Sequence, residues 1–340
     1  MSLTSLFTDI ANAIRDKKGT SNPIKAINFA SEIASIEVGG SSGSSGNDKL
    51  ISLVEGTITE IKDSDLEGAT KLRNYALAFS TNLTSVSIPN NITNIGTNCF
   101  EGCTVLKTVN LQANITFIAD NIFKNCSSLE TINIPNSVKS IESYAFDGCS
   151  KLTNLTLPEN VKSISAYSFA DSGITNINIS SGLTTISMYA FNNCKNLVEI
   201  HLPDNASLSS SAFEGCSSLT TITLPANLKA ISSGLFRNCT SLETVNIPSK
   251  VTNVQANGFY GCTSLKNITI PENVTSIGSG AFRNCTGLEE MTILRATPPS
   301  LSTNTIPTTI NTIYIPLGSL SAYQSATNWS SFSGKFVELS

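Results

Sequence analysis

The chain of 340 residues carries a net charge of −4, and only 14% of its residues are charged, against about 25% in a typical soluble domain. Its surface is therefore expected to consist largely of Ser, Thr and Asn. The sequence contains no basic stripe, which argues against nucleic acid as a partner, and no apolar run near the roughly 20 residues that span a membrane.

The first 38 residues carry an amphipathic helical pattern. Apolar residues recur there at the spacing of one helix face: Leu3, Leu6, Phe7, Ile10 and Ile14. A weaker pattern follows through Phe29, Ile33 and Ile36. Residues 1–38 are therefore predicted to form a helical hairpin, and the Gly/Ser-rich residues 39–48 a flexible linker.

A hairpin this short does not bury enough apolar surface to fold alone, so its apolar stripe needs a partner. It could associate with copies of itself, dock on a larger assembly, or cap the rest of the chain. The linker favours attachment or oligomerisation over capping, because a cap is usually continuous with the element that it covers.

Residues 49–311 repeat with a period of 22 or 23 residues. Each period contains a phenylalanine: Phe100, Phe123, Phe146, Phe169, Phe191, Phe213, Phe236, Phe259 and Phe282. A cysteine follows three residues later, except where Ser172 replaces it: Cys103, Cys126, Cys149, Cys194, Cys216, Cys239, Cys262 and Cys285. A fixed period of this length predicts a solenoid, in which each unit buries its apolar face on its neighbours.

Residues 146–164 illustrate one repeat. Leu152, Leu155 and Leu157 have the spacing of a leucine-rich repeat and predict a short strand. Pro158 closes this strand, because proline cannot donate to a ladder. Val161–Ile164 begins the return path, where a second short strand would fit.

The order of these blocks resembles the BspA-type leucine-rich repeat family, which is common in surface proteins of gut and oral bacteria. The resemblance covers about residues 50–316 and implies a repeat solenoid with a parallel β-sheet. Residues 312–340, which include the single tryptophan, Trp329, resemble the closing segment of such proteins. They are predicted to form a C-terminal cap with a last strand and a short helix.

The nine cysteines predict neither disulfides nor a metal site. Eight of them lie in one column, and stacked side chains point the same way, whereas a disulfide needs Cβ atoms about 3.5–4.5 Å apart with a particular torsion. A zinc site needs ligands that converge on one point. Free buried thiols are therefore expected, with no metal and no cofactor.

The sequence predicts no enzymatic activity. The single histidine, His201, aligns with Asn178 and Thr223 of the neighbouring repeats, which cannot complete a catalytic triad. No phosphate-binding loop, metalloprotease motif or nucleophile elbow occurs, and the acidic residues are scattered. A weaker alternative is a glycan-processing enzyme, with Glu199 and His201 as its only conceivable site.

The outward face of the predicted strands is the candidate ligand-binding surface. Two columns with 18 positions in total hold eight Thr and seven Asn, although asparagine is depleted in strands. The candidate residues are Asn110, Asn133, Asn154, Asn176, Asn178, Glu199, His201, Asn246, Asn267 and Glu290. The amides could form ladders between stacked repeats, or they could bind a polysaccharide or glycoprotein. The absence of aromatic residues from these columns weakens the case for sugar.

The start of the chain does not have the charge order of a secretory signal peptide. Residues 1–38 are similar to a short leader on phage and prophage tail-associated proteins of Firmicutes. This resemblance implies a non-enzymatic receptor-binding protein of a virion tail, in which the hairpin attaches or oligomerises and the solenoid contacts a surface protein or polysaccharide of a host cell. The alternative is a BspA-like adhesin at a bacterial cell surface, which binds host protein or glycan.

Overall fold

The computed structural model describes residues 58–340. Their contacts divide them into two compact units, one ending at Pro158 and the other spanning Glu159–Ser340, and each unit is described by itself. The hairpin predicted for residues 1–38, with Leu3, Leu6, Phe7, Ile10 and Ile14, lies outside the described residues, as does the linker at 39–48.

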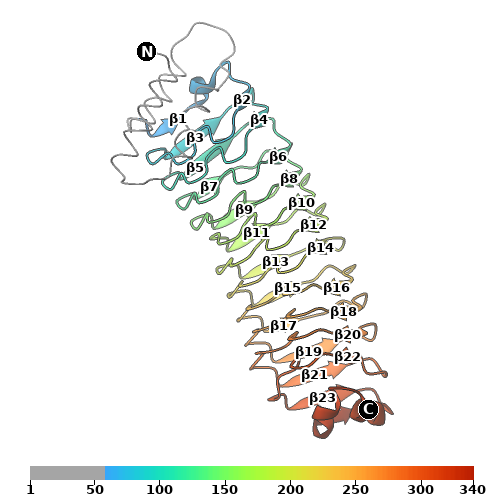
Figure 1. Ribbon diagram of the computed structural model, residues 1–340. Coiled ribbons are helices and arrows are strands. Elements are labelled where there is room, and N and C mark those ends of the chain that lie inside the picture. The colour runs from blue at the N-terminus through green and yellow to red at the C-terminus, as the bar shows by residue number, and fades with distance from the viewer. Residues whose placement is uncertain (1–57) are drawn as a thin grey trace. The chain divides into compact units, whose positions relative to one another are not determined.

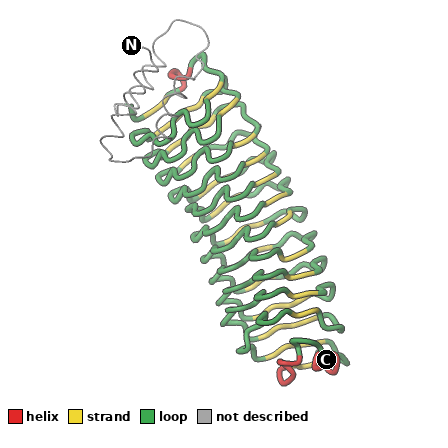
Figure 2. The backbone as a smooth tube through the Cα atoms, viewed as in Figure 1, coloured by secondary structure: helices red, strands yellow, loops and turns green. Residues whose placement is uncertain are grey.

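The first unit is a stack of short parallel strands joined by loops (Figure 1, Figure 2). The odd-numbered strands lie on one side: β1 (Glu60–Ile61), β3 (Ser85–Ile88), β5 (Thr108–Leu111), β7 (Thr131–Ile132) and β9 (Asn154–Thr156). The even-numbered strands lie on the other: β2 (Lys71–Leu72), β4 (Asn94–Ile95), β6 (Phe117–Ile118) and β8 (Ser140–Ile141). One short 3-10 helix, η1 (Asp63–Leu66), follows β1.

The second unit repeats this arrangement. Its odd-numbered strands are β11 (Asn176–Asn178), β13 (Glu199–His201), β15 (Thr221–Thr223), β17 (Thr244–Val245), β19 (Asn267–Ile270), β21 (Glu290–Ile293) and β23 (Thr312–Ile315). Its even-numbered strands are β10 (Ser163–Ile164), β12 (Thr185–Ile186), β14 (Ser207–Leu208), β16 (Ala230–Ile231), β18 (Asn253–Val254), β20 (Ser276–Ile277) and β22 (Ser300–Leu301). Within residues 58–340, no helix has the length and apolar character that crossing a membrane requires.

Strands pair in parallel, each residue with its counterpart one repeat later. Val86 pairs with Val109 in the first unit, and Ile200 with Ile222 in the second. The predicted solenoid of leucine-rich repeat units is therefore confirmed within each unit. The return path also forms a strand in each repeat, which keeps two ladders in register and leaves the interior for apolar side chains.

The recurrent phenylalanines form the centre of the core. All nine are fully buried, and their rings stack from one repeat to the next. In the first unit the centroids of Phe100 and Phe123 are 5.4 Å apart. In the second unit successive rings are 5.3 to 5.9 Å apart. Stacked rings at this spacing gain more free energy than their buried area alone provides, which explains why phenylalanine recurs at this position in nine repeats.

All nine cysteines are free and buried, as predicted. Each Sγ of the column donates to a main-chain carbonyl of the preceding repeat, for example Cys126 to Phe100 at 3.1 Å. Burial raises the pKa of the Cys103 and Cys194 thiols to about 12. These thiols are therefore protonated at neutral pH, and they act as small core residues rather than as nucleophiles.

The turn that carries each phenylalanine places residues in the left-handed region on both sides of it. In one repeat these are Tyr144 (φ 58°) and Gly148 (φ 74°), which flank Phe146; in another, Asn121 (φ 55°) and Asn125 (φ 60°) flank Phe123. Asparagine and glycine adopt this conformation most readily. The turn thus favours Asn and Gly at these positions, although Tyr144, Tyr167 and Tyr189 also adopt this conformation.

Beyond β23 the chain forms α4 (Leu320–Ser325), the 3-10 helix η2 (Ser330–Lys335) and β24 (Phe336–Glu338). Trp329 is fully buried, and its Nε1 donates to the Pro299 carbonyl at 2.7 Å. The Tyr323 ring meets it edge-on with centroids 5.4 Å apart. These contacts fix the segment to the end of the second unit, and β24 adds a last parallel strand beside β23.

Candidate functional site

The odd-numbered strands present alternate side chains to solvent. In β5, Thr108 and Asn110 are exposed, while Val109 and Leu111 are buried. The same alternation occurs in β9, β11, β13, β15 and β19. We call these solvent-facing side chains of the odd-numbered strands the outward face.

The structure places every candidate residue on the outward face, and all ten are exposed. Eight lie within strands: Asn110 in β5, Asn154 in β9, Asn176 and Asn178 in β11, Glu199 and His201 in β13, Asn267 in β19 and Glu290 in β21. Asn133 and Asn246 directly follow β7 and β17. The two outward columns of side chains predicted from the sequence extend one strand further, because Tyr314 of β23 is in register with Thr292.

Register brings some of these residues side by side. His201 lies beside Thr223, and Glu199 beside Thr221. Asn267 lies beside Glu290. Among residues 58–340, no three His, Cys, Asp or Glu side chains converge to hold a metal ion. The outward face can therefore donate and accept hydrogen bonds.

The amides of the outward face bond in several ways. Asn133 joins two repeats, because its Oδ1 accepts from the Leu111 N–H at 2.7 Å and its Nδ2 donates to the Leu111 carbonyl at 2.8 Å. Asn110 donates to the Ser87 hydroxyl one repeat earlier, at 3.0 Å. Asn154 donates to the hydroxyl of its own neighbour, Thr153, at 3.1 Å. Some amides thus tie repeats together, while others remain turned to solvent.

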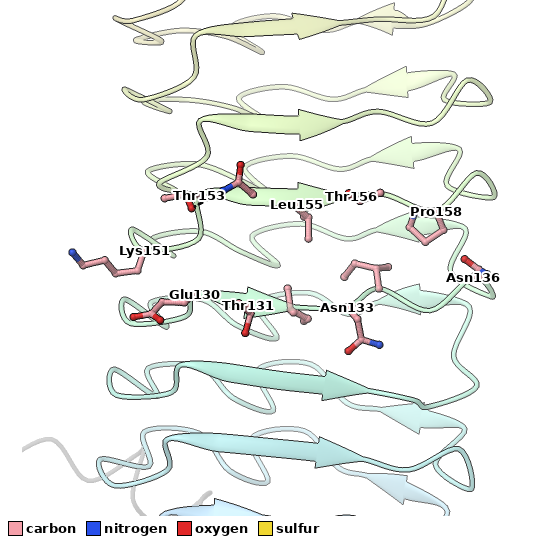
Figure 3. Close-up of a pocket in the computed structure, with 12 residues that line it drawn as sticks. Glu130, Thr131, Asn133, Asn136, Lys151, Thr153, Leu155, Thr156 and Pro158 are labelled. Atoms are coloured by element: carbon pink, nitrogen blue, oxygen red, sulfur yellow. Dashed lines mark hydrogen bonds between the residues drawn. The ribbon is translucent and has the colours of Figure 1, made fainter.

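A hollow of about 780 Å³ opens on the outward face between β7 and β9. Its lining includes the outward residues Thr131, Asn133 and Asn154, and the apolar Leu155. Figure 3 shows Thr131, Asn133 and Leu155 along the two strands, with Glu130 and Lys151 at one end of the hollow and Asn136 and Pro158 at the other. The outward face is therefore concave between these two strands.

The hollow exists because the ladder stops at β7. The sheet of β1, β3, β5 and β7 ends there, so the outer edge of β7 carries main-chain amides that no strand pairs. The same two repeats stay joined beside the phenylalanines, where Phe123 N donates to Ala145 O at 2.9 Å. Ser150 Oγ also donates to Ser127 O at 3.2 Å. The two repeats thus stay joined here, although no ladder joins β7 to β9.

Sequence reasoning missed the ends of these ladders, although a signal was present. In the described chain, three ladders of odd-numbered strands stop, at β7, β11 and β17. In each case an asparagine occupies the second outward position of the last strand or directly follows that strand: Asn133 after β7, Asn178 in β11 and Asn246 after β17. The side-chain amide of Asn133 bonds to the N–H and the carbonyl of Leu111, in place of main-chain groups of β7. We infer that this shortens β7 to two residues. Asn110 of β5 also occupies the second outward position, but its ladder continues to β7.

Comparison with known proteins relates the chain to one family. The family model of the BspA type leucine rich repeat region matches residues 70–198 and 184–305, in six copies. A leucine-rich repeat protein from Bacteroides ovatus shares 22% identity, with 84% of this chain and 82% of its own aligned at a TM-score of 0.58, which supports the fold.

Two further solved structures are similar at lower TM-scores. A leucine rich cell surface protein from Faecalibacterium prausnitzii shares 25% identity over 80% of this chain and 83% of its own, with a TM-score of 0.45. The pneumococcal vaccine antigen PcpA shares 19% identity over 83% and 76%, with a TM-score of 0.46. A search of the curated proteins found no match.

Proposed function

The chain belongs to the family of BspA-type leucine-rich repeat proteins, and on this premise we propose that it is a non-enzymatic recognition protein whose outward face binds a protein or polysaccharide of a cell surface. One observation carries the proposal. The outward face repeats short, mostly uncharged hydrogen-bonding side chains in register from strand to strand, and it becomes concave between β7 and β9.

Such a surface suits an extended ligand. Each hydrogen bond contributes only about 0.5–1.5 kcal/mol, so several repeats must act together to overcome the loss of freedom on binding. Repeats of fixed register provide equally spaced contacts without reorganising. The scarcity of charge on the outward face favours a ligand that is recognised by shape and hydrogen bonding rather than by ionic attraction.

The proposal assigns no catalytic role to the outward face. His201 lies beside Thr223 of the next strand, and Glu199, two residues away on the same face of β13, lies beside Thr221. The cysteines are buried, and burial holds the pKa of Cys103 and Cys194 far above neutrality. Replacing Glu199 and His201 with alanine is expected to have no effect on glycan cleavage. Cleavage should be absent from both the native chain and the variant, or equal in both if a contaminating enzyme causes it.

A binding array tests the proposal. The full chain is probed on immobilised bacterial and mucosal polysaccharides and extracellular-matrix proteins, beside two variants. Asn154→Arg places a long cation in the hollow, whereas Asn90→Arg places the same cation on an exposed turn away from the outward face. We expect saturable binding that Asn154→Arg weakens at least tenfold and Asn90→Arg does not. Equal binding by both variants would contradict a role for the outward face.

A virion tail is the second candidate location for this recognition. The observation in its favour is the similarity of residues 1–38 to a leader of phage and prophage tail-associated proteins, with the helical stripe from Leu3 to Ile14 as attachment or oligomerisation surface. Light scattering of the full chain beside residues 47–340 separates the candidates. A closed oligomer that dissociates on truncation favours the tail protein, and two monomers favour a free-standing adhesin.

A further inference from the structure

A second hollow, of about 340 Å³, lies in the C-terminal part of the second unit, away from the outward face of β7 and β9. It forms between the loop that follows β22 and the chain around η2. We refer to it as the C-terminal hollow, and its lining includes Thr303, Asn304, Thr308, Asn328, Ser330 and Phe332. Its volume falls at the lower end of the range of ligand pockets, about 300–1,000 Å³.

The chemistry of its lining is uniform. All eleven lining residues are uncharged, and eight of them carry a hydroxyl or an amide. The nearby ammonium group of Lys335 is occupied, because it donates to the carbonyls of Thr308 and Ile310. A charged ligand would therefore find no counter-ion in the lining, whereas a ligand rich in hydroxyl groups would find both donors and acceptors.

Several of these polar groups have no partner within residues 58–340. The exposed side chains of Thr303, Asn304, Thr308 and Ser330 form no hydrogen bond there, whereas other lining groups bond to the main chain. Thr305 Oγ1, for example, donates to the carbonyl of Ser302 at 2.8 Å. The unpartnered groups thus stand around a space in which they can bond to a ligand.

The walls that carry these groups are held in place. Asn328 Nδ2 donates to the Leu301 carbonyl at 2.6 Å and joins the two sides of the hollow. Asn304 and Asn328 both have left-handed backbone conformations, with φ of 54° and 66°. Phe332 adds an apolar ring to the lining. A fixed wall reduces the entropy that is lost on binding.

We propose that the C-terminal hollow binds a neutral carbohydrate, one or two pyranose rings in length. The hydroxyls of the sugar would exchange hydrogen bonds with Thr303, Asn304, Thr308 and Ser330, whose side chains are exposed around the hollow. Neutral sugar is favoured over acidic sugar because the lining has no cation to receive a carboxylate. This site does not depend on the outward face and does not rest on the proposed function.

Titration of the full chain with single sugars tests the proposal. The probes are the methyl glycosides of glucose, galactose, mannose and N-acetylglucosamine, with glucuronic acid as the charged comparison, followed by saturation-transfer NMR and calorimetry. At least one neutral glycoside is expected to bind saturably and more tightly than glucuronic acid. If no neutral glycoside binds, or if glucuronic acid binds as tightly, the proposal is overturned.

Matched variants locate the binding. Thr308→Val removes a lining hydroxyl with little change of shape, and Thr309→Val makes the same change at the adjacent exposed residue outside the hollow. Asn304→Gly removes the amide while permitting the left-handed backbone. Thr308→Val and Asn304→Gly are each expected to weaken binding about five- to tenfold, as for loss of one hydrogen bond, and Thr309→Val to leave it unchanged. Undiminished binding in both lining variants, with unfolding midpoints like that of the native chain, would overturn the assignment.

Discussion

The amide of Asn133 is the contact whose removal most directly probes how the outward face is built. Asn133→Ala deletes two hydrogen bonds, at 2.7 and 2.8 Å, to the main chain of Leu111. At about 0.5–1.5 kcal/mol each, the free energy of unfolding should fall by about 1–3 kcal/mol. Asn154→Ala is the control, because its exposed amide bonds only to the adjacent Thr153 hydroxyl, and it should cost less than about 0.5 kcal/mol.

Urea unfolding followed by circular dichroism measures the difference between the two variants. With a slope of about 3 kcal/mol per molar urea, a loss of 2 kcal/mol lowers the midpoint by about 0.7 M. The slope itself should not change, because the substitution leaves the surface exposed on unfolding nearly constant. If Asn133→Ala and Asn154→Ala have the same midpoint, the amide of Asn133 does not tie the repeats, and our explanation of the shortened β7 is wrong.

Three further predictions concern the core and the turns. Phe191→Ala should destabilise the chain by about 3–5 kcal/mol in thermal or urea unfolding, because its ring is fully buried between stacked rings; a loss below 1 kcal/mol would contradict the stacked core. Gly148→Ala should destabilise more than Gly334→Ala, because Gly148 has φ +74° and a Cβ there would lie 2.7 Å from a neighbouring amide oxygen, whereas nothing lies within 4 Å at Gly334. Burial raises the pKa of Cys103 and Cys194 from 9.0 to about 12, so the unfolded state loses these protons first and stability should fall as pH rises from 9 toward 12. Replacing Cys103 with alanine should make the urea midpoint decrease less steeply with pH. If the midpoint decreases with pH as steeply as in the native chain, the thiol does not have this role.

The repeated core was predictable from sequence because burial imposes strict chemistry at every turn of the solenoid. Phe146, Cys149 and Leu152 each occupy a buried position that favours one size of side chain. Their regular recurrence therefore predicted the solenoid. The left-handed residues beside each phenylalanine left a similar signal in the recurrence of Asn and Gly. These features depend on single positions within one repeat and therefore survive in the linear pattern.

The two hollows could not be predicted in the same way. The first lies where the ladder ends at β7, next to Asn133, whose amide bonds to the main chain of Leu111 in the preceding repeat. The second requires Asn304 and Asn328 to lie on facing walls, although no periodicity relates them. Both sites arise from departures from the repeat, and a consensus pattern records only what the repeats share.

The claim that ligand is recognised on the outward face is tested most directly by hydrogen–deuterium exchange of the full chain, free and with the best-binding probe of the array. The unpaired outer edge of β7 should exchange quickly in the free chain, because its amides lack strand partners. We predict that ligand slows exchange in residues 131–133 and 154–156, and leaves the turn at residues 89–92 unchanged. Protection confined to the turns, with no change in β7 or β9, would contradict the account.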